Sequence, residues 1–150
     1  MTLEQIGILT GILSTVVAGI YFLVKNFKEK RRIFRTKFAG KWENEGDITW
    51  SKFETHFVEL KLEVDIENGE ITGTIESRVV GSETTSPPCS VNGNLKCTSA
   101  GIQITHVRHG ELLVYGKAKI KLKKKILYWN LEEGFADFFP NNTKLVKNPL

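Results

Sequence analysis

The amino-acid sequence predicts an all-β fold, an antiparallel up-and-down barrel of about eight strands, preceded by one transmembrane helix. Three observations lead to this prediction. The chain opens with an uncharged, largely apolar run of 19 residues, 6–24. From Phe38 onward, apolar and polar residues alternate with the period of two that is typical of β-strands. The alternating stretches are short and sequential, and no amphipathic helix is present to cover a sheet.

The first element is the apolar run 6–24, which is long enough to cross a bilayer as a helix. At a rise of about 1.5 Å per residue it spans roughly 28 Å, close to the thickness of the hydrocarbon core. A cleavable signal peptide carries its positive charge before the apolar stretch, whereas here Glu4 is the only charged side chain before the run. Basic residues follow in 25–37, so we expect this side of the membrane to be the cytoplasm.

The charge distribution divides the chain into an anchor, 1–24, a basic juxtamembrane linker, 25–37, and a cytoplasmic barrel domain, 38–150. The linker holds seven basic residues and one acidic residue, whereas the barrel domain holds 14 basic and 15 acidic residues. The formal charge of +4 therefore arises beside the membrane. This pattern indicates contact with membrane lipid, and we expect no binding of DNA or RNA.

The predicted membrane helix carries small residues at every fourth position. Such a row forms a shallow groove where a second helix backbone can approach, so it predicts self-association. The alternative is that glycine is simply frequent in membrane helices. The row consists of Gly7, Gly11, Thr15 and Gly19.

The strands follow from the alternation and from turn signals between the alternating stretches. Asn68-Gly69 lies between two such stretches and predicts a tight hairpin with positive φ at both turn residues. The polar segment 81–88 predicts a loop. The expected strands are 40–45, 58–66, 71–79, 89–98, 101–108, 111–123 after a turn at 108–110, 125–132 and 142–147.

This strand count fits either a sandwich or a barrel, and we favour the barrel because closure removes exposed edges. The strand 111–123 places Leu112, Val114, Gly116 and Ala118 on the inner face. The small residues at 116 and 118 predict space for a ligand. The alternative is that Gly116 only relieves a bend in the strand.

The opposite face of the same strand carries a series of lysines. Lysines on a strand commonly guard a solvated edge against aggregation. A surface that binds phosphate or lipid headgroups is the functional alternative. The series consists of Lys117, Lys119, Lys121 and Lys123, followed by Lys124 and Lys125.

Catalytic, metal and cofactor sites are not predicted. His106 and His109 are too close along a strand and turn to aim both rings at one metal, and His56 is distant in sequence. Cys89 and Cys97 do not form a C-x-x-C motif. No catalytic sequence motif is present, so we do not expect an enzyme.

The chain resembles the membrane-anchored, β-barrel effectors of CBASS antiphage systems, the SMODS-associating, β-strand-rich effectors. The resemblance rests on the membrane helix, the opening Gly40-Lys41-Trp42, and the segments 115–118, 127–130 and 144–147. It implies a bacterial inner-membrane protein whose lipocalin-like barrel binds a cyclic di- or oligonucleotide made by a partner nucleotidyltransferase. It further implies homo-oligomerisation and disruption of the membrane. Family members typically have two membrane helices, so a single helix would give the small-residue row a larger role.

We expect the ligand to enter one mouth of the barrel and to contact aromatic, cationic or amide side chains near strand ends or beside Gly116. The alternative is a core position for Trp42 and Tyr128 and a solvated strand end for Arg78 and Arg108. Two other functions remain open, a membrane-tethered carrier of an apolar molecule and a ligand-free interaction scaffold. The candidates are Trp42, Arg78, Arg108, Tyr115, Tyr128 and Asn130.

Overall fold

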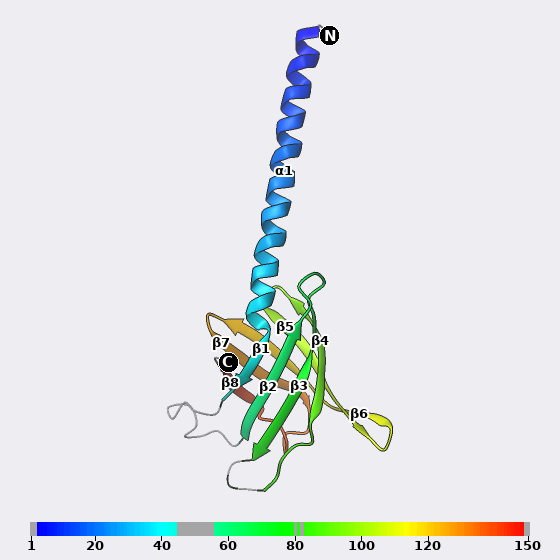
Figure 1. The fold of residues 1–150 in the computed structure, drawn as a ribbon, viewed down its shortest axis with the longest axis vertical. Coiled ribbons are helices and arrows are strands. Elements are labelled where there is room, and N and C mark those ends of the chain that lie inside the picture. The colour runs from blue at the N-terminus through cyan, green and yellow to red at the C-terminus, as the bar shows by residue number, and fades with distance from the viewer. Residues whose placement is uncertain (1–2, 45–55, 80, 82, 149–150) are drawn as a thin grey trace. The chain divides into compact units, whose positions relative to one another are not determined.

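The described residues form one helix and eight strands (Figure 1). The computed structural model describes residues 3–44, 56–79, 81 and 83–148, and for residues 3–13 it describes the backbone only. The chain divides into two compact units, Met1–Ile33 and Phe34–Leu150. The elements are α1 (Leu3–Phe38), β1 (Gly40–Glu43), β2 (His56–Val64), β3 (Glu70–Val79), β4 (Cys89–Lys96), β5 (Ser99–Arg108), β6 (Glu111–Lys123), β7 (Ile126–Gly134) and β8 (Asn142–Lys147).

The strands form a closed antiparallel barrel, as the alternation predicted. Each strand pairs with its neighbours in sequence, and β1 pairs with β8 to close the sheet. A sandwich is therefore excluded. The closing seam is short, since only Trp42 and Glu43 of β1 face residues of β8, namely Lys147 and Val146.

The helix α1 continues through the predicted linker as far as Phe38, so the basic segment 25–37 is helical. In the part of the chain whose side chains are described, no helix combines the length and the apolar character needed to cross a membrane. Residues 6–13 of the expected span, including Gly7 and Gly11, lie outside that part. The transmembrane anchor therefore stays a prediction. The unit boundary places Phe34 and the rest of the last turn of α1 with the barrel.

The described core side chains lie inside the barrel, and a tryptophan lies near each end. At one end Phe38, the last residue of α1, is completely buried, and the indole Nε1 of Trp42 donates a hydrogen bond of 2.8 Å to its carbonyl. At the other end Phe139 is completely buried in the β7–β8 connection, and Nε1 of Trp129 donates to the Pro140 carbonyl at 2.9 Å. Each end thus holds a buried phenylalanine from outside the strands.

The β2–β3 turn differs from the expected two-residue turn. Only Gly69 has positive φ, at 80°, so the prediction of positive φ at Asn68 is wrong. The turn is longer because Oδ1 of Asp65 accepts hydrogen bonds from the backbone N–H groups of Glu67 and Asn68, which is an Asx turn. Ile66 therefore belongs to the turn and not to β2.

The β5–β6 hairpin extends past the barrel wall. His109 and Gly110 form its turn with φ of 53° and 84°, as a two-residue type I′ turn requires. A β-bulge at Tyr115 shifts the register, and β7 pairs with β6 only from Gly116 onward. Leu112 and Val114 are therefore exposed, and the prediction that they face the interior is wrong.

Candidate anion-binding face

The lysines of β6 lie on the outer surface of the barrel. Lys119, Lys121 and Lys123 are exposed, whereas the residues between them are buried, as the alternation predicted. This part of β6 pairs with β5 on one side and with β7 on the other. The lysines therefore guard no free edge, and the explanation of an edge protected from aggregation is wrong. A different reason is needed for their accumulation.

The strand register places Tyr128 among these lysines. Lys121 of β6 lies opposite Tyr128 of β7, which in turn lies opposite Lys144 of β8. The ammonium nitrogen of Lys123 lies 5.4 Å from the centre of the Tyr128 ring, and that of Lys144 lies 6.0 Å from it. These distances are in the range of cation–π contacts. The next row pairs Lys119, Asn130 and Asn142 across the same strands.

We call this surface the lysine–tyrosine face. It spans β6, β7 and β8 in the half of the barrel that carries the β6–β7 turn, and its other outward residues, Ile126, Asn142 and Val146, carry no charge. None of its residues is acidic. It consists of Lys119, Lys121, Lys123, Tyr128, Asn130 and Lys144.

On the outer surface of β1 and β2, lysine side chains form ion pairs with glutamates. Lys41 lies 2.8 Å from a carboxylate oxygen of Glu59 and 3.5 Å from one of Glu43. The hydrogen bond between Lys41 and Glu59 raises the pKa of Lys41 and lowers that of Glu59. Lys117 is likewise paired, 2.6 Å from Glu133, which raises its pKa. Lys41 and Lys117 therefore meet carboxylates on the outer surface of the barrel.

The lysine–tyrosine face has the groups that nucleotide recognition needs. Alternate residues on a strand are about 7 Å apart, so Lys119, Lys121 and Lys123 form a row of cations that can contact successive phosphates. The Tyr128 ring offers a surface on which a base can stack. The amide of Asn130 can donate to and accept from a base edge.

The structure brings together only two of the six predicted ligand residues, Tyr128 and Asn130. Trp42 is 1% exposed and its indole N–H is bonded within the core, so it has the core position that was the alternative reading. Arg108 is exposed on β5 beside the hairpin turn. Tyr115 packs with aromatic rings, 5.3 Å from the centre of Phe135.

The lysines around Tyr128 were not among the expected ligand residues, although a surface that binds phosphate or lipid headgroups was the alternative stated for the lysines of 117–125. Their alternation had placed them on the outer face, and the expected ligand site was an inner mouth of the barrel. The pairing of β6 with β7 after a turn at Lys124 places Lys121 opposite Tyr128. This register could have been inferred from the sequence, and it would have predicted that the lysines surround Tyr128.

Gly116 lies where β6 and β7 approach each other closely. A Cβ at this position would lie 2.7 Å from the backbone carbonyl oxygen of Glu133, so the glycine allows β7 to approach closely at an irregularity in the pairing. Gly116 also lines a depression of about 370 Å³, and a ligand space beside it stays a prediction. Ala118 is itself completely buried.

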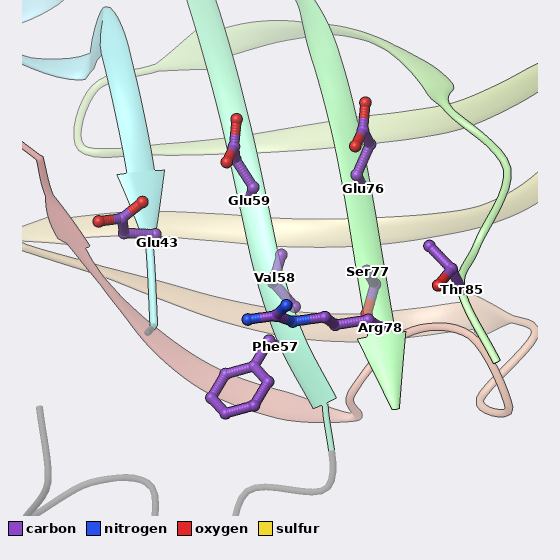
Figure 2. Close-up of a pocket in the computed structure, with 8 residues that line it drawn as sticks. All are labelled: Glu43, Phe57, Val58, Glu59, Glu76, Ser77, Arg78 and Thr85. Carbon is purple, nitrogen blue, oxygen red and sulfur yellow. The ribbon is translucent and has the colours of Figure 1, made fainter. Parts of the chain in front are cut away.

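Arg78 lines a separate surface pocket of about 190 Å³ on the outer side of β1, β2 and β3 (Figure 2). Its guanidinium lies 4.9 Å from the centre of the Phe57 ring. The pocket also contains the carboxylates of Glu43, Glu59 and Glu76, so its charge opposes the binding of phosphate. Figure 2 shows the Glu59 and Glu76 side chains above Arg78 on the neighbouring strands.

The described residues include no group of three or more histidine, cysteine, aspartate or glutamate side chains that could hold a metal ion. His106 Nδ1 lies 3.0 Å from the Pro88 carbonyl, and His56 Nε2 lies 3.2 Å from the Asp137 carbonyl. Cys89 is buried, and burial raises the pKa of its thiol to about 11.

Comparison of the chain with protein-family models, curated proteins and solved structures found no match in any of the three. The resemblance to CBASS effectors therefore rests on the sequence features alone. The function must be argued from the geometry of the barrel and its surface.

Proposed function

We propose that this chain is a membrane-anchored antiphage effector whose cytoplasmic barrel senses a cyclic di- or oligonucleotide on the lysine–tyrosine face. The observation that carries the proposal is the position of Tyr128, with Lys123 and Lys144 beside its ring on a face without acidic residues. A closed sheet needs no lysines for edge protection at this place. An aromatic ring among cations is the arrangement that binds bases and phosphates together.

In this proposal a base stacks on Tyr128 while phosphates contact Lys121 and Lys123. Asn130 orients the base edge by hydrogen bonds. Because the face is on the outside of the barrel, one ligand can contact two copies of the protein at once. Binding then favours association, and the associated helices disrupt the inner membrane.

The membrane anchor is supported by the exposed apolar surface of α1. Side chains between Val16 and Val24 are roughly half exposed or more, including Tyr21 at 70% and Leu23 at 68%. A helix that is apolar on all sides is typical of a membrane span. The basic segment 25–37 then favours a cytoplasmic barrel.

The buried aromatic core argues against the carrier of an apolar molecule. Such a ligand would have to displace Trp42, Trp129, Phe38 or Phe139, all of which are at most 2% exposed. Truncating a buried aromatic side chain costs about 3–5 kcal/mol, which shows how much packing would be lost on opening the barrel.

The binding test uses the full chain in detergent micelles, titrated with a panel of cyclic di- and trinucleotides. A stacked base contributes about 1–3 kcal/mol, so Tyr128→Ala is expected to weaken the dissociation constant by about one to two decades. Tyr128→Phe keeps the ring and is the matched control. Equal affinity of the Tyr128→Ala and Tyr128→Phe proteins, or no binding of any nucleotide to the folded parent, contradicts the proposal.

The contribution of phosphate contacts is tested with lysine variants at constant ionic strength. Lys121→Gln and Lys123→Gln are expected to weaken nucleotide binding and to reduce its salt dependence, because each removes one cation from the face. Lys96→Gln changes an exposed lysine of β4 outside the face and serves as the control. An equal effect of all three substitutions would show that only net charge matters.

The membrane step is tested by dye release from liposomes that contain the full chain. At Gly19 an added Cβ would meet nothing within 4 Å, so Gly19→Leu does not disturb a single copy of the chain. We expect this substitution to reduce nucleotide-dependent release, since it fills the groove between helices. Unchanged release would remove the small-residue row from the mechanism.

A further inference from the structure

The β5–β6 hairpin carries an apolar surface that the proposed function does not use. Val107, Leu112 and Val114 are 61%, 67% and 49% exposed. Val107 lies directly opposite Leu112 in the register, and Val114 is two residues further along β6, so the three side chains share one face. We call residues 106–115 the β5–β6 arm. A single copy of the chain leaves this face in water.

The arm is also the part of β6 that has a free edge. β7 pairs with β6 only from Gly116 onward, and β4 pairs with β5 only as far as Thr105. Figure 1 shows the corresponding hairpin extending away from the barrel beside the label β6. Free edges are normally protected by charged residues or proline. Here the edge carries Leu112, Leu113 and Val114, whereas the lysines lie on the doubly paired part of the strand.

The hydrogen-bonding groups on this edge follow from the two-residue turn. The pair next to such a turn, Arg108 and Glu111, is a hydrogen-bonded pair, and hydrogen-bonded and non-hydrogen-bonded pairs then alternate. The pairs that contain Leu112 and Val114 are therefore of the second kind. Their backbone N–H and C=O groups point away from β5 and toward the free edge.

We infer that the β5–β6 arm pairs with the same arm of a second copy of this chain, edge to edge and antiparallel. Two copies of one strand that pair in this way are related by a two-fold axis, so each satisfies the edge of the other. In each of the two copies, Leu112 lies opposite Val114 of the other copy. The axis passes through Leu113. The two exposed apolar faces join into one surface across a four-stranded sheet.

The shape of the monomer beside the edge fits this register. A surface depression of about 370 Å³ is lined by Val114, Gly116, Gly134 and Phe135, among others. Counting along the antiparallel register, the turn residue Gly110 of the partner's arm lies opposite Gly116. The depression lies where the turn of the partner's arm would come, whereas the pairing edge of Gly116 itself is taken by Gly134 of β7.

A second copy fits this surface better than a lipid bilayer does. The free backbone groups at Leu112 and Val114 need hydrogen-bonding partners, which a bilayer core does not offer. An identical strand in antiparallel register supplies them in the right spacing.

The test is disulfide cross-linking of the full chain in detergent micelles, without nucleotide and with the exposed Cys97 changed to Ser. In the inferred register the two copies of residue 113 form a non-hydrogen-bonded pair, with Cα atoms about 4.5 Å apart, which a disulfide can bridge. Leu113→Cys is therefore expected to form a covalent dimer under mild oxidation. Thr74→Cys, on the exposed outer face of β3, is the matched control and is expected to stay monomeric on a denaturing gel.

A second variant excludes chance collisions of the exposed thiol. Leu112→Lys combined with Val114→Lys places charges on the edge without changing the barrel core. In this background we expect the cross-link at residue 113 to be lost while the thermal unfolding midpoint is unchanged. A retained cross-link, or equal cross-linking of the Thr74→Cys control, overturns the inference. Nucleotide affinity of the same variant reports on the lysine–tyrosine face separately, since the arm contributes no residue to it.

Discussion

A buried amide bridges the closing seam of the barrel, and its removal is expected to destabilise the whole sheet. Asn44 follows β1 and is 4% exposed. Its Oδ1 accepts a hydrogen bond of 2.8 Å from the backbone N–H of Val58, and its Nδ2 donates to the His56 carbonyl at 3.0 Å and to Oγ1 of Thr143 at 3.1 Å. One side chain therefore connects β1 with both β2 and β8. We predict that Asn44→Ala opens this connection.

The size of the effect follows from the groups that lose a partner. The N–H of Val58 would be left buried without an acceptor, which costs about 1–3 kcal/mol, and the two lost donor bonds contribute about 1 kcal/mol each. The expected loss of unfolding free energy is therefore about 3–5 kcal/mol. For a domain of this size that corresponds to a fall in the melting temperature of about 10–15 °C.

The assay is thermal unfolding of the full chain, followed by the fluorescence of the buried Trp42 and Trp129. Asn92→Ala removes the same side chain from an exposed position on β4 and is the matched control, with an expected change within about 0.5 kcal/mol. A melting temperature of the Asn44→Ala protein equal to that of the control would refute the reasoning. It would mean that the two backbone pairs of β1 with β8 suffice to close the sheet.

Three further predictions concern single positions in the barrel. Gly93→Ala is expected to lower stability by about 1–3 kcal/mol in urea unfolding, because its Cβ would lie 2.4 Å from the Gly101 carbonyl oxygen, whereas Gly101→Ala meets nothing within 4 Å and is expected to be tolerated. At pH 8 an alkylating reagent is expected to modify the exposed Cys97 and to leave Cys89 unmodified, since burial raises the pKa of the Cys89 thiol to about 11; rapid modification of both thiols in the folded protein would contradict the buried position. Backbone hydrogen bonds from the β2–β3 turn lower the pKa of Asp65 below its ordinary value of 3.8, so its contribution to stability is present above pH 3.8 and is lost as the pH falls through the lower folded value; unfolding curves of the parent and of Asp65→Ala should converge there, and a constant difference down to pH 2 would exclude this origin.

The sequence predicted the strands well because their residues alternate over long stretches. The strands 111–123 and 142–147 agree with β6 and β8 at both ends. The barrel followed from the short sequential strands and the absence of covering helices. These signals are local, because the alternation of each strand can be recognised from the residues of that strand alone.

The parts that the sequence did not predict depend on contacts between distant residues. Phe38 and Phe139 are buried at the two ends of the barrel, yet they lie in a helix end and a turn, where no strand period marks them as core. The exposure of Leu112 was missed because the alternation continues unchanged through the bulge at Tyr115. Because the sequence did not mark these two phenylalanines as core residues, the ligand site was expected at an open mouth of the barrel.

The burial of Phe38 also decides where this protein can be cut. Arg35 donates hydrogen bonds to the backbone carbonyls of Ile66 and Glu67, and Phe34 packs against the barrel core. A fragment that begins at residue 38 loses both contacts, although it contains every strand. Expression of a soluble barrel should therefore begin before Phe34, and a protease that cleaves between Phe34 and Phe38 should release a fragment that unfolds more readily than one cleaved upstream.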